Sequence, residues 1–575
     1  MYRLFALLPL LFLALPAQGA AQNAAAQESI RVQDTPTPDA STFGMDSTRF
    51  PHVSYAGSTP QQVSALLAGI PAPLGSGVEK DILTALMMMP VYPDSADAIP
   101  PGWFLVRVDK MIRLGAYADA LRLVGSLPDG LRDEATTRRY VDLALTLGDL
   151  DTACTATTHY LDQSNKQVDG YWNLRQAFCH RVAGEDDKAE LMLGIYSEQY
   201  PGQQPLAYSL LSNWGNSKEF LPPYSSADGE SVPLLVACLK HSKTSKATER
   251  LSAGFITEQE VPGMTPALAS ALAERGVFAY PLRLKLAALA VASGAADATV
   301  LRELLEQAKP SQALPLPLQT QAALLSDINS SQSAENKISA VVHALAAFKQ
   351  DYTPYVARGI VSRELETFTR SPDSYPLTPE LTLDMAAYYI ERNNSSSARD
   401  VQRYLERRAS QDEAFRIALA SVRSALYYNR LLGGEETEAG TVPEFTTPQR
   451  AELMWALRRL VMVQQALGED VPAASVSLAQ TAPLADTLSP TASTMLALEE
   501  AEKNGRSGEL LLLSLQLLGD GKLAFVSDEV FARCIRALQQ AELTSYAAAL
   551  AQAAILNPPF AALRSGGTLV GEIRP

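Results

Sequence analysis

The stretch GAYADA at residues 115–120 recurs as GDLDTA at 148–153 and as GEDDKA at 184–189. Each stretch begins with a glycine that can form a tight turn and ends, five residues later, with a small alanine. The glycines are 33 and 36 residues apart, which is the period of proteins built from stacked helix pairs. The spacing therefore predicts a repeat architecture instead of one globule closed around an active site.

Helical periodicity continues on both sides of these turns. The segments 103–114, 134–147 and 171–183, which precede the three glycines, each have the length of one helix. Along 451–468, apolar residues recur on one helical face and polar residues fall elsewhere. The apolar set is Leu453, Leu457, Leu460, Val461 and Leu467, and the polar set is Glu452, Arg458, Arg459 and Gln465. Alternation with period two is almost absent, so we expect an all-α fold.

Several helix starts are marked by a hydroxyl residue followed by proline. A Ser or Thr side chain at the N-cap accepts a backbone N–H, and proline fits the next position because an N–H there would have no helical partner. We expect a helix to begin at each of five such pairs: Thr59-Pro60, Thr265-Pro266, Thr378-Pro379, Thr447-Pro448 and Ser489-Pro490.

The three glycine-to-alanine stretches resemble the turn and second-helix start of tetratricopeptide repeats. In that family the glycine closes the turn within a helix pair, and the alanine lets the second helix pack against the first. Pro201 stands where the family's repeat-ending proline falls, although the other two repeats lack it. The resemblance covers residues 101–201, with weaker echoes at 393–398, 468–473 and 519–524. It implies a right-handed superhelical α-solenoid of stacked helix pairs.

The N-terminus is typical of a secretory signal peptide. Arg3 supplies one positive charge, an apolar run follows at 4–15, and small residues extend to Ala21. The run is too short for a stable membrane span, and later apolar stretches contain charged residues. We therefore expect cleavage, secretion into the periplasm and no membrane span.

The composition limits the partners. The formal net charge is −15, and an acid excess disfavours binding to nucleic acid or anionic lipid. Hydrophobic residues make up 47% of the chain, which is ample for a buried core, and four cysteines are far too few for a disulfide-dense scaffold. We expect a protein or peptide partner, no nucleic acid and no cofactor, and the oligomeric state stays open.

Breaks rich in proline, glycine and serine suggest an organisation along the chain. The longest break is acidic and is a candidate hinge, although a loose loop on one continuous superhelix fits it equally well. The expected parts are a signal peptide (1–21), a disordered spacer (22–58), tetratricopeptide-like repeats (59–221), degenerate helical repeats (222–434), an acidic linker (435–448), a C-terminal helical section (449–558) and an irregular tail (559–575).

The repeat resemblance brings two cysteines together. Cys154 falls just inside the second helix of one repeat, and Cys179 falls late in the first helix of the next. These helices are neighbours in tetratricopeptide stacking, so a disulfide is expected in an oxidising compartment. The alternative is two buried thiols that pack as small apolar residues. No pairing is predicted for Cys238 and Cys534.

Motifs with chemistry are scarce. His159 and His180 lie near the two cysteines, but the spacing is poor for zinc. The basic run 240–246 could bind an acidic partner or anionic lipid headgroups, but a solvated helix end is favoured. Met87-Met88-Met89 fits a core as well as a docking groove. Standard enzyme signatures are missing from the sequence, and we assign no catalytic, cofactor-binding or metal residue.

These observations favour a noncatalytic interaction scaffold of the bacterial envelope, because stacked helix pairs present extended binding faces. A permanent subunit of a motor, secretion, division or cell-wall apparatus would use the same surface. An enzyme is the alternative, since the gross form resembles that of soluble lytic transglycosylases. That family carries a Glu-Ser catalytic pair in a C-terminal domain, whereas Glu230-Ser231 lies mid-chain here and no further motif of the family follows it.

Overall fold

The computed structural model describes residues 40–45, 49–71, 77–91, 93–163, 169–203, 205–214, 232–241, 265–274, 278–308, 314–434, 442–483, 492–519 and 523–559. Contacts divide the chain into the units Met1–Asp39 and Ala40–Pro575, and every described residue belongs to the second unit. The expected signal peptide, the pair Ser489-Pro490 and nearly all of the tail lie outside the described residues.

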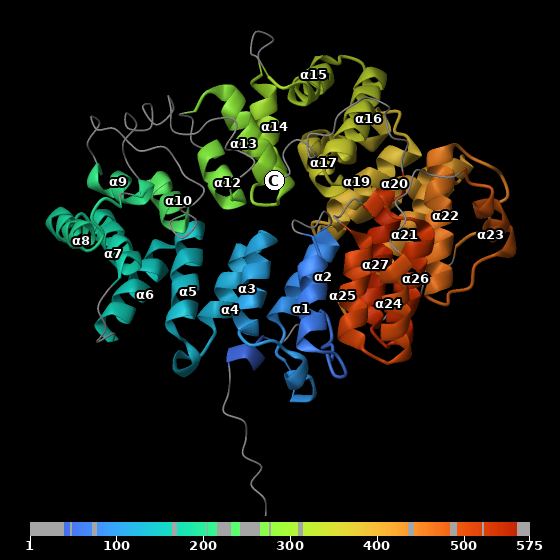
Figure 1. The fold of residues 1–575 in the computed structure, drawn as a ribbon. Coiled ribbons are helices and arrows are strands. Elements are labelled where there is room, and N and C mark those ends of the chain that lie inside the picture. Colours follow the sequence, from blue (N-terminus) through green and yellow to red (C-terminus); the bar gives the residue numbers. More distant parts are fainter. Residues whose placement is uncertain are drawn as a thin grey trace, which may run out of the picture. The chain divides into compact units, whose positions relative to one another are not determined.

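These described stretches form 26 α-helices and no β-strand, which confirms the all-α prediction (Figure 1). The N-terminal helices are η1 (Ala40–Thr42), α1 (Pro60–Gly69), α2 (Gly77–Met88) and η2 (Pro93–Ala98). The next group is α3 (Trp103–Arg113), α4 (Tyr117–Gly125), η3 (Asp129–Leu131), α5 (Glu134–Leu147), α6 (Leu150–Gln163), α7 (Gly170–Ala183) and α8 (Asp186–Gln199).

Later helices continue the same pattern. The middle of the chain forms α9 (Leu206–Ser212), α10 (Val232–His241), α12 (Pro266–Glu274), α13 (Tyr280–Ala292), α14 (Ala298–Glu306), α15 (Leu316–Ser330), α16 (Ala334–Asp351), α17 (Pro354–Ile360), α18 (Ser362–Arg370) and η6 (Pro372–Ser374). The rest forms α19 (Pro379–Ile390), α20 (Ser395–Ala409), α21 (Glu413–Leu432), α22 (Ala451–Ala466), α23 (Ala473–Gln480), α24 (Ala492–Lys503), α25 (Ser507–Leu518), η7 (Leu523–Phe525), α26 (Asp528–Gln540) and α27 (Thr544–Leu556).

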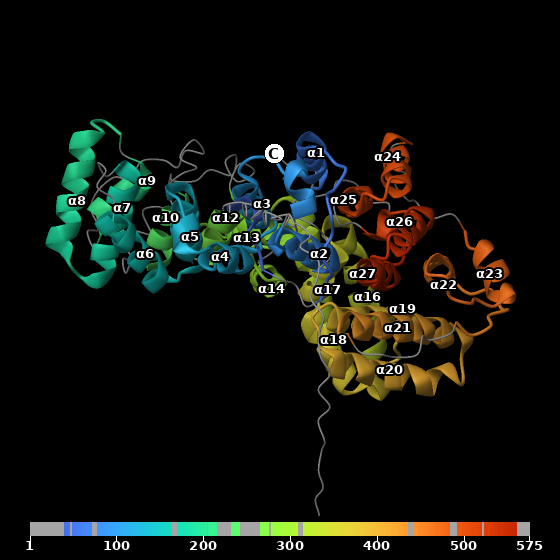
Figure 2. The same cartoon turned by 90° about the horizontal axis from the view of Figure 1, so that it is seen from below.

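The three predicted turns each join a helix pair. Their glycines adopt the left-handed conformation, with φ of 70° at Gly115, 81° at Gly148 and 75° at Gly184. The alanines five residues later are fully buried: Ala120, Ala153 and Ala189. The pairs α3–α4, α5–α6 and α7–α8 follow one another in space as they do in the chain (Figures 1 and 2). We call α3 to α8 the repeat block.

Two more turns have the same geometry without a glycine. Asn393 between α19 and α20 and Glu542 between α26 and α27 have φ of 56° and 59°, which is uncommon for residues with a side chain. The residues five positions later, Ala398 and Ala547, are again fully buried. The helix-pair geometry therefore extends beyond the part of the chain in which the sequence displays it clearly.

Two glycines near the end of the repeat block allow a matched test. Gly194 lies inside α8, where an added Cβ would meet nothing within 4 Å, so Gly194→Ala should stabilise the protein by about 0.5–1 kcal/mol. Gly184 also has open space, but its positive φ should make Gly184→Ala destabilising by about 1–2 kcal/mol. Chemical denaturation measures both changes. Equal effects of the two variants would contradict the assigned turn.

Helix starts agree only in part with the hydroxyl-proline pattern. The hydroxyl oxygens of Thr59, Thr265 and Thr378 accept backbone N–H groups of α1, α12 and α19. The start predicted at Thr447-Pro448 is wrong, because α22 begins only at Ala451. Nearby Phe445 is fully buried, and its N–H donates to Ser475 Oγ (2.9 Å), which ties this segment to the core in a non-helical conformation.

Parts of the expected spacer at 22–58 and of the expected linker at 435–448 pack on the core. Residues 49–58 pack on the core through Phe50, Val53 and Tyr55, which are 3%, 1% and 5% exposed. Residues 442–446 likewise bury Val442 and Phe445. In both segments a few spaced apolar side chains anchor a stretch whose overall composition is polar. The remaining internal boundaries stay predictions.

The first and last described helices of the unit pack together. Helix α1 contacts α25, and α2 contacts α27. The Tyr546 ring of α27 stacks on Phe50 with ring centroids 5.0 Å apart, and its hydroxyl donates to the Pro51 carbonyl (2.7 Å). The N–H of Gly508 donates to the Ser54 carbonyl (2.8 Å). Such contacts go beyond the nearest-neighbour contacts of a simple stack, and the superhelical sense stays a prediction.

Four arginines are fully buried and join distant segments: Arg107, Arg302, Arg358 and Arg459. Placing Arg459 on the polar face of α22 was wrong. Its guanidinium donates to the carbonyls of Leu523 (3.0 Å) and Asn557 (2.7 Å) and pairs with Asp528 (2.6 Å). Backbone carbonyls in irregular segments thus accept hydrogen bonds from a buried guanidinium.

Candidate functional site

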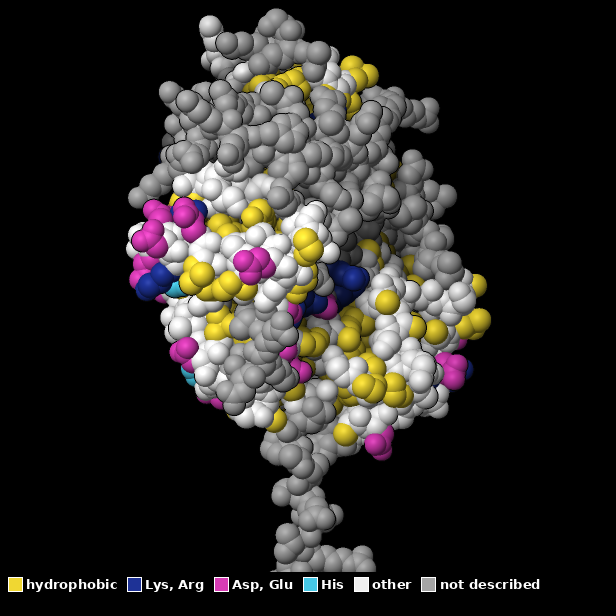
Figure 3. Space-filling model, turned by 60° about the vertical axis from the view of Figure 1, so that its left-hand side comes forward, with side chains coloured by type: hydrophobic (Ala, Val, Ile, Leu, Met, Phe, Trp, Pro, Cys, Tyr) yellow, Lys and Arg dark blue, Asp and Glu magenta, His cyan; other side chains and the backbone are white. Residues whose placement is uncertain are grey.

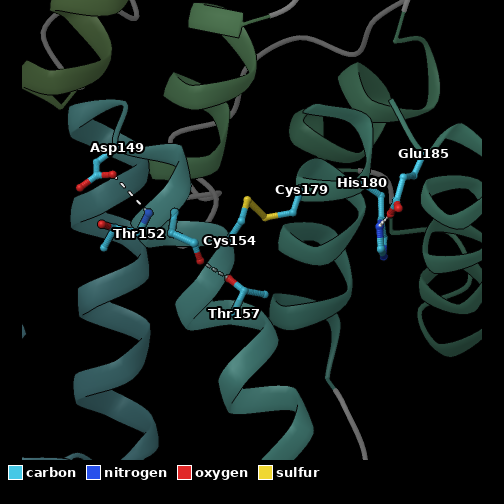
Figure 4. The surroundings of a disulfide bond; sticks show 8 residues. Asp149, Thr152, Cys154, Thr157, Cys179, His180 and Glu185 are labelled. Carbon is cyan, nitrogen blue, oxygen red and sulfur yellow. Dashed lines mark hydrogen bonds and ion pairs between the residues drawn. A yellow bond between two sulfur atoms is a disulfide. The ribbon is translucent and has the colours of Figure 1, made fainter. Parts of the chain in front are cut away.

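The first candidate region is the repeat block, where a disulfide joins two successive helix pairs. Cys154 of α6 and Cys179 of α7 are bonded, with Cα atoms 5.6 Å apart (Figure 4). The two helices contact each other directly, as the repeat resemblance implies. The other two cysteines are free and buried, and burial raises the pKa of the Cys534 thiol to about 12. They are therefore poor nucleophiles.

Ion pairs reinforce the same helices. The buried Arg175 of α7 pairs with Asp142 of α5 (2.5 Å), and Arg138 of α5 pairs with Glu134 (2.6 Å) and with Asp169, the N-cap of α7. Buried pairs with several hydrogen bonds hold a fixed geometry even where they add little net stability. The ion pairs thus fasten α5 to α7, the first helices of successive pairs, while the disulfide fastens α6 to α7.

The histidines beside the disulfide have other partners. His180 Nδ1 lies 2.7 Å from Glu185 Oε2, at the turn between α7 and α8 (Figure 4), and His159 contacts Gln163 (2.9 Å). Hydrogen bonds from Lys188 and His180 lower the pKa of Glu185. No group of three or more His, Cys, Asp or Glu side chains in the described part of the chain is placed to hold a metal ion.

The disulfide leads to a quantitative prediction. Replacing both Cys154 and Cys179 with serine should lower the free energy of unfolding by about 3 kcal/mol, because the bridge closes a loop of 25 residues in the unfolded chain. The measurement is denaturant unfolding of oxidised, reduced and doubly substituted protein. After denaturation without reductant, only Cys238 and Cys534 should react with a thiol reagent. Four reactive thiols would contradict the bridge.

The surface of the repeat block carries isolated apolar side chains. Among the described residues, seven large hydrophobic side chains are exposed, and four of these belong to the repeat block: Val106, Leu147, Val182 and Leu191. Figure 3 turns the side of the molecule that holds α5 to α9 towards the viewer, and hydrophobic side chains lie there among acidic ones. Leu191 on α8 is 61% exposed.

The second candidate region is a pocket of about 420 Å³ outside the repeat block. Four elements surround it: the start of α2, the turn between α13 and α14, the start of α17 and the turn between α19 and α20. Its volume lies within the range of roughly 300–1,000 Å³ that is usual for small-molecule sites. The charged and aromatic residues that line it are Lys80, Asp81, Asp297, Tyr355, Glu391 and Arg392.

Local structure positions the lining residues. Lys80 lies in the first turn of α2, and its ammonium reaches the α13–α14 turn, where a Cβ added to Gly294 would be 3.7 Å from Nζ. Tyr355 follows Thr353, which caps α17 by accepting the N–H of Val356 (3.3 Å). The guanidinium of Arg392 lies over the ring of Tyr355, 4.4 Å from its centroid.

Burial changes the protonation of two lining groups. It lowers the pKa of Lys80, although Asp81 and Asp119 partly oppose this shift by attracting the charged ammonium. It raises the pKa of Tyr355, so the phenol stays neutral at ordinary pH. Lys80 and Arg392 were not singled out by the sequence analysis. No local pattern marks them, because Lys80 is an ordinary charged residue in the first turn of α2 and Arg392 is an ordinary charged residue in the turn between α19 and α20. Only packing between distant helices brings the pocket together.

Other features from the sequence have plain structural roles or lie elsewhere. The three methionines at 87–89 are buried in the core, 0–8% exposed. Lys240 at the end of α10 donates to the Thr146 carbonyl of α5 (3.0 Å). The rest of the basic run after His241, and the pair Glu230-Ser231, lie outside the described residues.

Comparison with family models, with curated proteins and with solved structures gives no significant match for this chain. In the described residues, no helix is both long enough and apolar enough to cross a membrane. Functional inference therefore starts from the repeat block and the pocket.

Proposed function

We propose that this chain is a noncatalytic helical-repeat scaffold that binds a protein or peptide partner in the periplasm. The observation that carries the proposal is the distribution of exposed apolar side chains. More than half of the large ones in the described residues lie on the three consecutive helix pairs of the repeat block. Stacked helix pairs commonly bind partners along an extended surface, and exposed apolar side chains there can serve as contacts.

The fastening of the repeat block supports the proposal. A binding face held rigid before association loses less conformational entropy on binding. The disulfide, the Arg175–Asp142 pair and the Arg138–Asp169 pair all join successive helix pairs within this block. The tetratricopeptide-like, superhelical classification belongs to the same proposal, as does the role of an envelope-machine subunit.

Site-specific photocrosslinking in the source cells tests the scaffold. A photoreactive amino acid is placed at Leu191 of α8 or Val182 of α7, and the control is Leu316 of α15, which is 74% exposed and outside the repeat block. We expect a discrete envelope-protein adduct from Leu191 or Val182 and none from Leu316. Fractionation of the same cells tests the periplasmic location.

Two outcomes count against the scaffold. The scaffold proposal loses its main support if none of the four exposed apolar positions of the repeat block yields an adduct. Recovery of the protein alone and monomeric after gentle extraction with crosslinking would also count against it, because a scaffold without a partner has no function of this kind.

A further inference from the structure

The pocket presents two cations that form no ion pair with a carboxylate among the described residues. Asp81 and Asp119 attract the Lys80 ammonium without pairing with it, and Arg392 contacts aromatic rings and a carbonyl. Its guanidinium lies over Tyr355 and Tyr388, 4.4 and 4.3 Å from the ring centroids, and donates to the Tyr388 carbonyl (3.4 Å). Ring contacts hold a guanidinium in place without neutralising its charge.

The carboxylates of the pocket are already engaged by other groups. Asp81 pairs with Arg49 (3.2 Å), and Glu391 accepts from the buried Arg358 (2.7 Å) through Oε1, whereas its Oε2 has no hydrogen-bond partner. Asp297 caps α14.

The helix ends at the wall add little positive potential. Helices α2 and α14 both begin there, at Gly77 and Ala298, but Glu79 lies in the first turn of α2 and Asp297 caps α14, and both acids offset the partial positive charge of a helix N-terminus. The whole chain has a formal charge of −15, so a wall with two unpaired cations departs from the general surface. An anion is therefore the ligand whose charge this wall would offset.

Apolar groups and the nearby acids narrow the class of anion. Val291, Ala292, Ala296 and Val356 line the pocket beside the cations and can cover a hydrocarbon part. The planar guanidinium of Arg392 matches the two oxygens of a carboxylate. A doubly charged phosphate would meet stronger repulsion from Asp81 and Asp297 than a singly charged carboxylate.

We propose that this pocket binds the carboxylate of a small organic acid or of a peptide C-terminus, with Lys80 and Arg392 holding the carboxylate oxygens. The inference is independent of the scaffold function, because the lining helices lie outside the repeat block. A small organic acid and a peptide C-terminus present the same carboxylate to the two cations. They differ in the rest of the molecule, which is a peptide chain only in the second.

Isothermal titration of the purified full chain tests the site with four probes: acetyl-alanyl-alanine, its C-terminal amide, butyrate and inorganic phosphate. We expect saturable binding of the acid dipeptide or of butyrate, and none of the amide. Binding of the dipeptide alone identifies a peptide C-terminus, and binding of butyrate alone identifies a free organic acid. No saturable binding of either acid, or tighter binding of phosphate or of the amide, would overturn the proposal.

Substitutions locate the binding. Lys80→Met and Arg392→Gln should each weaken it by about tenfold or more, whereas Lys503→Met, at an exposed position of α24 outside the pocket, should not. Thermal unfolding of each variant reports whether it is folded, and Lys80→Arg, which keeps the charge, should retain most of the affinity. Unchanged affinity in folded Lys80→Met and Arg392→Gln proteins would place the ligand elsewhere.

Discussion

Replacing Arg358 with alanine should lower the free energy of unfolding by about 3–5 kcal/mol, because it leaves buried acids without their partner. The guanidinium is 1% exposed and pairs with Asp384 (3.0 Å) and Glu391 (2.7 Å). It also donates to the Leu556 carbonyl (2.7 Å), at the end of α27. One side chain therefore joins α17, α19 and the C-terminal helix.

Chemical denaturation measures this effect, and two further variants interpret it. Arg363→Ala removes an exposed guanidinium that is 3.4 Å from Glu306, so its cost should be below about 1 kcal/mol. Glu391→Gln in the Arg358→Ala background should recover part of the loss, because it removes the stranded charge while keeping nearly the same shape. If the double variant is no more stable than Arg358→Ala, the uncompensated charge is not the cause.

Replacing Tyr546 with alanine should cost about 3–5 kcal/mol, since it leaves a cavity where a fully buried ring stacks on Phe50. Tyr546→Phe keeps the ring and loses the hydroxyl's hydrogen bond to the partly exposed Pro51 carbonyl and its weak contact with Met89 Sδ (3.7 Å), so its cost should be about 1 kcal/mol. Denaturant unfolding of the two variants separates packing from hydrogen bonding.

Tyr546→Ala also tests how the N-terminal segment at 49–58 is held against α27. Hydrogen exchange of residues 49–58 should become faster in Tyr546→Ala, because Phe50 loses its partner in α27. Phe178→Ala in α7 is the matched control, since it empties another fully buried aromatic site in the repeat block. Equal protection of residues 49–58 in both variants would show that the contact between Phe50 and Tyr546 does not hold this segment.

The sequence predicted helix bounds and turns correctly where contacts within a few residues determine them. The predicted helix at 134–147 coincides with α5, and the turn at Gly148 has the expected positive φ. Glycine tolerates that conformation and a Thr or Asp N-cap satisfies backbone N–H groups within its own helix, so both signals are readable without a partner.

Local sequence was a poor guide where another segment supplies the reason. Glu542 occupies a left-handed turn that its residue type does not announce, and Arg459 is buried because three carbonyl groups and Asp528 surround it. Phe50 and Phe445 look like isolated apolar residues in polar stretches, and they are buried only because helices from elsewhere cover them.

Helix pairs with glycine turns could be predicted from local sequence, and the repeat resemblance placed Cys154 and Cys179 on neighbouring helices. The contacts of α1 and α2 with α25 and α27, and the pocket that Lys80 and Arg392 line, arise only in the folded chain. Turns and caps are satisfied within a few residues, whereas buried arginines and pocket walls need partners tens to hundreds of residues away, which no local pattern specifies.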